Sequence, residues 1–118
     1  MATTNSFDKY VVRISGGKNG RVSLLLCYSG NSFVGRIDFY PVDSTVPKDY
    51  LWHPNPTREY VVLHMPMSRF ESVMSTVRVE KPLHLYIDVN RGIGAFTNGN
   101  GHLATSEKEP IGEEEGTL

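Results

Sequence analysis

The stretch PMSRFESVMSTVRVEKPLHLYIDV, residues 66–89, contains the change of hydrophobic period that decides the fold class. In its first half, apolar residues recur at the spacing i, i+3, i+4 and i+7, which predicts an amphipathic helix of about three turns. The residues of this stripe are Phe70, Val73, Met74 and Val77. Ser68 and Glu71 have the spacing of a capping box, so we expect the Ser68 side chain to cap the start of the helix.

The second half of the same stretch alternates apolar and polar residues, which predicts a strand with one buried face. The apolar positions of this strand are Leu83, Leu85, Ile87 and Val89. Pro82 separates the two elements, because proline disfavours helical backbone in the residue before it. A helix followed by an alternating strand is typical of an α+β fold, in which the apolar stripe of the helix meets the apolar face of the sheet.

Four further strands are expected before the helix, over residues 10–14, 22–28, 33–40 and 58–65. Asn19-Gly20 supplies the positive φ that a tight hairpin turn needs. A short return strand is expected over residues 93–97, ending in a loose glycine-rich segment. We therefore predict an α+β fold: an antiparallel β-sheet meander of about five or six strands, in the order β-β-β-β-α-β-β, with one amphipathic helix packed on one face.

Residues 41–57 interrupt the strand pattern with four prolines, which predicts a long, stiffened loop. Loops of this length are often functional, and this one carries Tyr50, Trp52 and His53. Two interpretations of the loop remain open. Trp52 covers an open sheet edge, or the loop binds a ligand.

One domain is expected over residues 1–106, followed by a flexible acidic tail over residues 107–118. The formal net charge of −1 combines a body with 11 basic and 8 acidic side chains and a tail with five Glu and one Lys. The sequence contains no apolar run long enough to span a bilayer, and its start lacks the pattern of a secretory signal. We therefore expect a cytoplasmic protein without a membrane partner.

The sequence has no recognisable catalytic or metal-binding motif. Cys27 lies in the middle of an apolar run and is expected to be a buried structural thiol. The four histidines are spread along the chain, and no pair has the spacing of a helical metal site. We expect no cofactor, no metal and no catalytic residue. Whether the protein is an enzyme stays open, leaning against, because a composite site at a dimer interface leaves no trace in one chain.

The leading interpretation is a small, non-enzymatic binding or assembly module that forms a homodimer or larger homo-oligomer and binds a protein or small ligand. It depends on the partly apolar second face of residues 22–28, which one helix cannot cover, and on unpaired sheet edges. The candidate ligand- or partner-binding residues are Tyr50, Trp52, His53, Arg36, Tyr40 and Tyr86.

The alternative is a single-stranded nucleic-acid-binding protein, in which sheet-face aromatic residues stack on bases and arginines contact phosphates. Its candidate stacking residues are Tyr40, Tyr50, Trp52 and Tyr86, and its candidate phosphate contacts are Arg13, Arg21, Arg36, Lys48 and Arg58. The acidic tail would compete for the same groove. The small positive charge of the body makes nucleic acid the less favoured partner.

Overall fold

The structure is a computed structural model that describes residues 2–14, 20–55, 57–89 and 96–105. Its described strands are β1 (Ala2–Phe7), β2 (Lys9–Ile14), β3 (Ser23–Ser29), β4 (Ser32–Tyr40), β5 (Asp49–Asn55), β6 (Arg58–Pro66), β7 (Leu83–Val89) and β8 (Phe96–Ala104). They form one eight-stranded sheet in the order β1-β7-β8-β5-β6-β4-β3-β2. β4 and β6 are parallel, and the other neighbouring pairs are antiparallel. A 3₁₀ turn, η2 (Met67–Arg69), and the helix α1 (Phe70–Val79) connect β6 to β7.

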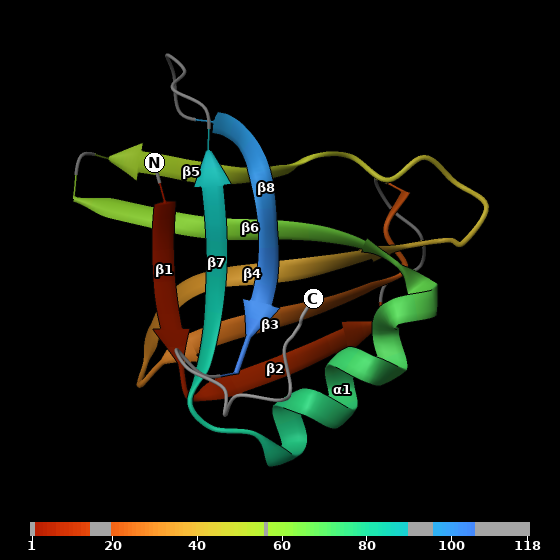
Figure 1. The fold of residues 1–118 in the computed structure, drawn as a ribbon, viewed down its shortest axis with the longest axis horizontal. Helices are drawn as coiled ribbons and strands as arrows, with labels where there is room; N and C mark the ends of the chain where they lie inside the picture. The colour runs from red at the N-terminus through yellow and green to blue at the C-terminus, as the bar shows by residue number, and fades with distance from the viewer. Residues whose placement is uncertain (1, 15–19, 56, 90–95, 106–118) are drawn as a thin grey trace, which may run out of the picture.

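The sheet curls into a nearly closed, barrel-like shape with two layers (Figure 1). β1, β7 and β8 run across the direction of the other five strands, and β8 bends from one layer toward the other. The two edge strands, β1 and β2, are consecutive in the sequence and meet at Asp8. The Asp8 backbone N–H donates to the Tyr28 carbonyl at 3.0 Å, and its carboxylate accepts from the Gly30 N–H at 3.0 Å. The two sheet edges therefore converge at one corner.

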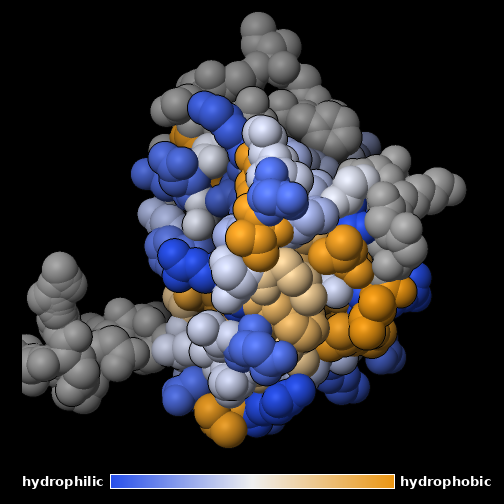
Figure 2. Space-filling model, turned by 90° about the vertical axis from the view of Figure 1, so that its right-hand side faces the viewer, coloured by the Kyte–Doolittle hydropathy of each residue, from blue (hydrophilic) through white to orange (hydrophobic). Residues whose placement is uncertain are grey.

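Apolar side chains from both layers and from the helix fill the interior. Fully buried members include Leu25, Cys27, Ile37, Phe39, Val61, Leu63, Leu85 and Ile87. The stripe of α1 adds Val73, Met74 and Val77, and the Phe70 ring meets the Phe39 ring edge-to-face at 5.1 Å. Figure 2 shows the side of the molecule where α1 lies, with apolar side chains grouped among polar ones.

The predicted helix and its apolar stripe are confirmed, whereas the predicted capping box is wrong. Ser68 lies within η2, the residue before α1 is Arg69, and no side-chain hydrogen bond caps the helix. The strands predicted over residues 10–14, 22–28, 33–40, 58–65 and 83–89 are confirmed as β2, β3, β4, β6 and β7, with ends that differ by at most one residue.

Among the described residues, no helix has the length and apolar composition needed to cross a lipid bilayer.

The prediction of a five- or six-stranded meander is wrong, because the sheet contains two additional strands and a parallel pair. β1 is mostly polar, so it lacks the apolar alternation by which strands are recognised. It pairs with β7, and Asn5 also connects it to β4 and β6, because Asn5 Nδ2 donates to the Val34 carbonyl at 3.0 Å and the Glu59 carbonyl at 2.9 Å.

The predicted long loop over residues 41–57 is also wrong in its second half, where β5 forms a central strand between β8 and β6. Pro54 is tolerated there because it lies where the pairing register between β5 and β6 shifts. The glycine-rich segment predicted as a loose end is part of β8. A Cβ at Gly101 would collide with the Leu63 side chain and crowd the Tyr86 carbonyl, so glycine permits the close approach.

Three of the sequence expectations fall on residues outside the described part of the chain. They are the part of the predicted tight turn that precedes Gly20, the start of the return strand and the acidic tail. Gly20 itself is described and has the expected positive φ, 81°.

Candidate functional site

Strand alternation separates an interior face from an outward face in the layer formed by β2, β3, β4, β6 and β5. In β4, Ile37 and Phe39 are buried in the core, so Arg36, Asp38 and Tyr40 point to the outside. Residues that pair across strands share a face, so the register extends this surface over all five strands. We call this surface the outer face.

At the centre of the outer face is Asp38, a carboxylate that is only 1% exposed. Arg36 Nε donates to both of its oxygens, at 2.9 and 3.2 Å. Arg21 Nη1 and His64 Nε2 each lie 3.6 Å from Asp38 Oδ2. Burial alone would raise the pKa of Asp38, but the His64 contact and the charge and hydrogen bonds of Arg36 outweigh it and lower this pKa below its ordinary value. The carboxylate is therefore ionised and held by its neighbours.

His64 links the carboxylate to the segment that precedes β5. Its Nδ1 lies 2.8 Å from the Lys48 carbonyl oxygen, which can only accept, so Nδ1 carries a proton. Its Nε2 faces Asp38, and the rings of Tyr40 and Tyr50 each lie 5.5 Å from the imidazole. Both ring nitrogens are therefore engaged by protein groups, which is the arrangement of a positioning residue rather than of a general base.

Asp49 supports this region from the interior side of β5. Its carboxylate accepts the His64 backbone N–H at 2.6 Å and the Gly101 N–H at 3.0 Å, so it connects β6 with β8. Burial raises the pKa of Asp49, and the two backbone hydrogen bonds offset only part of that effect.

A cavity of ≈ 480 Å³ opens beside Asp38 on the outer face. It is lined by Arg21, Arg36, Asp38, Tyr40, Pro47, Lys48, Tyr50 and His64. The lining combines three cationic side chains with one carboxylate, and that carboxylate is already paired. The cavity therefore carries a net positive charge that favours an anionic group.

Arg36 is held at the wall of this cavity in a fixed orientation. Its Nη2 donates to the Tyr50 hydroxyl at 3.2 Å, in addition to the bonds from Nε to Asp38. Val62 lies between Arg36 and Tyr50 in the strand register and is 0% exposed, so the side chains of Arg36 and Tyr50 cover it. Within the described residues, Arg36 Nη1 has no hydrogen-bond partner and the exposed Lys48 ammonium has no ion pair. Both donors remain available to an anion.

Four aromatic rings cross the outer face next to this cavity. The ring centroids of Tyr28 and Phe33 are 5.8 Å apart, those of Phe33 and Tyr60 are 5.0 Å apart, and those of Trp52 and Tyr60 are 5.2 Å apart. All four side chains belong to half-buried residues. We call them the aromatic row. Trp52 follows Tyr50 on the same side of β5, which places the row about 7 Å from the cavity wall.

A β-bulge brings Phe33 into the aromatic row. The register between β3 and β4 shifts at Tyr28, which pairs with Phe33, whereas Cys27 pairs with Gly35. The shift moves Phe33 to the outward side of the sheet. Without it, the alternation of β4 would place Phe33 on the same side as the core residues Ile37 and Phe39. A Cβ at Gly35 would collide with the Val61 carbonyl and the Leu85 side chain, so glycine allows the bulged strand to lie against β6.

The structure brings together four of the six residues predicted from the sequence. Arg36, Tyr40 and Tyr50 line the cavity, and Trp52 lies in the aromatic row. His53 and Tyr86 lie elsewhere. His53 Nδ1 is 3.4 Å from Glu59 Oε2, and the Tyr86 ring stacks on His102 at 4.6 Å in the other layer.

Sequence reasoning missed the central role of Asp38 and His64, neither of which is among the residues predicted to bind a ligand or partner. The spacing Arg36-x-Asp38 was the available signal, because residues i and i+2 of a strand share a face.

The other described residues form neither a metal-binding cluster nor a reactive thiol. No group of three or more His, Cys, Asp or Glu side chains there could hold a metal ion. Cys27 is buried in the core as predicted, and burial raises the pKa of its thiol to about 12, which makes it a poor nucleophile at neutral pH.

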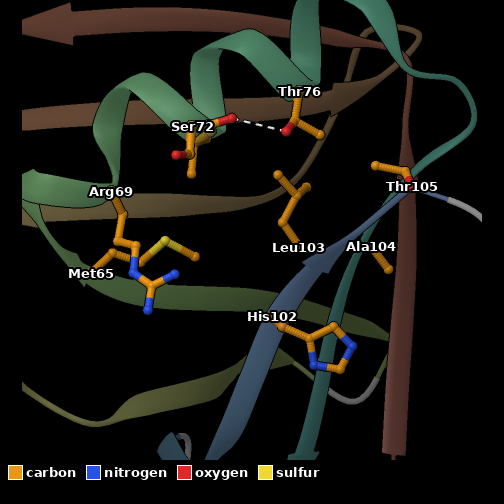
Figure 3. Close-up of a pocket in the computed structure, with 9 residues that line it drawn as sticks. Met65, Arg69, Ser72, Thr76, His102, Leu103, Ala104 and Thr105 are labelled. Atoms are coloured by element: carbon orange, nitrogen blue, oxygen red, sulfur yellow. Dashed lines mark hydrogen bonds between the residues drawn. The ribbon is translucent and has the colours of Figure 1, made fainter. Parts of the chain in front are cut away.

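A second cavity, of ≈ 490 Å³, lies between α1 and β8 (Figure 3). Arg69 and His102 lie on opposite sides of it, and the Thr76 hydroxyl donates to the Ser72 carbonyl at 2.8 Å. Its lining contains no carboxylate and one arginine, with small and apolar side chains making up most of the rest. It therefore lacks the fixed ion cluster of the outer face.

Comparison with protein-family models, curated proteins and solved structures found no match to this chain.

We predict that Asp38→Asn lowers the free energy of unfolding by about 2 to 4 kcal/mol at neutral pH, because it leaves the surrounding cations without their anion. Removing one partner of a fully buried ion pair lowers the stability somewhat more than this. The loss is smaller here because Arg36 is 20% exposed and can be partly solvated. Urea denaturation of both proteins measures the difference, with the exposed Asp43→Asn variant as a control that changes little.

The effect of Asp38→Asn should also depend on pH. Because the folded pKa of Asp38 lies below its unfolded value of about 4, its stabilisation is present above that value and is lost as pH falls through the folded pKa. The parent protein then loses the same charge, so the difference between the two proteins should shrink in acid. The raised pKa of Asp49 acts in the opposite direction but cancels in this difference. A difference that stays constant with pH contradicts the ionised state of Asp38.

Proposed function

We propose that the protein is a non-enzymatic binding module and that its ligand-binding surface is the outer face, with the cavity beside Asp38 receiving an anionic group. The observation that supports this most directly is the fixed position of Arg36. Asp38 and Tyr50 hold its guanidinium at the wall of a cavity that Arg21 and Lys48 also line. A cation that is already ordered loses little conformational entropy on binding, which favours affinity.

The chemistry of the same site favours binding over catalysis. His64 is the natural candidate for a general base, but its two nitrogens face the Lys48 carbonyl and Asp38. Cys27 is directed into the core, away from the cavity. With no activated nucleophile at the cavity among the described residues, the site lacks the pairing of nucleophile and base that covalent catalysis needs.

We expect inorganic phosphate to bind the protein at low ionic strength, and Lys48→Ala to weaken this binding about two- to fivefold through loss of one exposed charge. Isothermal titration calorimetry measures the affinity. Lys81→Ala is the matched control, since Lys81 is exposed but lies in the segment between α1 and β7, away from the outer face. Equal affinities for the two variants, or no phosphate binding by the parent, would contradict an anion site at this cavity.

The proposal includes self-association, for which the edge strand β2 is the candidate surface. β2 pairs with β3 on one side only, and its Val11 is 44% exposed. An edge strand with exposed apolar side chains is a template for pairing with a second copy.

Light scattering coupled to size exclusion should then give a mass twice that of one chain. Val11→Lys should shift the mass to that of a monomer, because a charge at the pairing edge opposes association. Val79→Lys, which changes a 76%-exposed valine at the end of α1, is the control and should leave the dimer intact. A monomeric parent protein would remove self-association from the proposal and leave the anion site unaffected.

A further inference from the structure

The charges of the described strands are distributed unevenly between their two faces. Register and alternation place six basic side chains on or at the rim of the outer face. Lys9, Arg13, Arg36 and Arg58 lie on the strands themselves, and Arg21 and Lys48 lie in the segments that precede β3 and β5 and line the cavity. This is half of the 12 Lys and Arg residues in a chain whose formal net charge is −1.

Carboxylates are nearly absent from the same surface. Among the described residues of these five strands, Asp38 is the only carboxylate that points outward, and it is buried and paired. Asp49 and Glu59 alternate with the outward residues Tyr50 and Tyr60, so they point to the opposite side. Glu59 accordingly contacts Thr3 of β1, whose Oγ1 donates to its Oε1 at 3.4 Å. The outer face is thus strongly basic although the whole chain is not.

Aromatic side chains occupy the same surface as this charge. Lys48, Tyr50 and Trp52 follow one another on one side of β5, and Trp52 leads into the aromatic row. At the other end of the row, Lys9 pairs with Tyr28. Near its middle, Arg58 Nη1 donates to the Tyr60 hydroxyl at 3.3 Å. Cations therefore flank half-buried aromatic rings at both ends and at the centre.

We propose that the outer face binds single-stranded nucleic acid, with phosphates at the basic side chains and bases against the aromatic row. This inference rests on the proposed function and names its ligand class. A polyanion matches the surplus of positive charge, and unpaired bases have the flat apolar faces that stack on aromatic rings. An acidic peptide would use the charge but would leave the aromatic row without a matching partner.

Fluorescence provides a direct test, because Trp52 is the only tryptophan of the chain. Titration with oligothymidylate of about 15 nucleotides, a length that covers one typical binding site, should quench Trp52 emission at low salt. Affinity should fall as salt rises, and Arg58→Ala should reduce the slope of log K against log salt by about 0.7, the value for one lost phosphate contact. Arg78→Ala, which removes an exposed charge from α1, should leave this slope unchanged.

A second measurement isolates the stacking contribution. With a fluorescently labelled oligothymidylate and anisotropy as the readout, Trp52→Ala should weaken binding about tenfold. Polyglutamate of similar length is the competitor that tests charge alone, and it should displace the oligonucleotide poorly. Circular dichroism of each variant confirms that it is folded.

The outcomes separate this inference from the function on which it rests. Phosphate binding at the cavity together with oligonucleotide binding that is insensitive to Trp52, or matched by polyglutamate, overturns the nucleic-acid inference and leaves the anion-binding module standing. Failure of both phosphate and oligonucleotide to bind overturns both. Quenching, a salt slope that responds to Arg58 and a loss of affinity in Trp52→Ala support the inference.

Discussion

The burial of the Asp38 carboxylate is the constraint on which the outer side of the sheet depends. An ionised carboxylate removed from water is tolerated only when cations and donors surround it. Arg36 comes from the same strand, Arg21 from the segment before β3, and His64 from the parallel neighbour β6. Satisfying one charge therefore fixes the positions of three segments, and His64 also secures the Lys48 backbone.

The same constraint explains why the surface is suited to binding. Arg36 is ordered by Asp38 and Tyr50 before any ligand arrives, yet it lines the cavity and keeps its charge there. The neutralised carboxylate removes the repulsion that an anion would otherwise meet, and the surrounding cations remain in excess. The aromatic row, ordered by its ring contacts, extends this prearranged surface along the strands.

The sequence predicted what local rules control and missed what depends on remote partners. The period change at residues 66–89 identified α1 and β7, because each follows from its own side chains. β1 has little apolar pattern and forms only because β7 pairs with it, and β5 contains a proline that argued for a loop. At the site, Arg36, Tyr40 and Tyr50 were identified by residue type. The neighbourhood of Asp38 and His64 was not, because it results from the parallel pairing of β4 with β6, which are neighbours in the sheet although β5 separates them in the sequence.

The central claim is that anions bind the outer face at the cavity beside Asp38. Amide chemical shifts from ¹H–¹⁵N correlation spectra, recorded during a titration with inorganic phosphate, locate the bound anion without any mutation. The account predicts that the largest shifts fall on Arg36, Tyr50 and His64. Shifts concentrated on Ser72, Thr76 and His102, which line the cavity between α1 and β8, would contradict it.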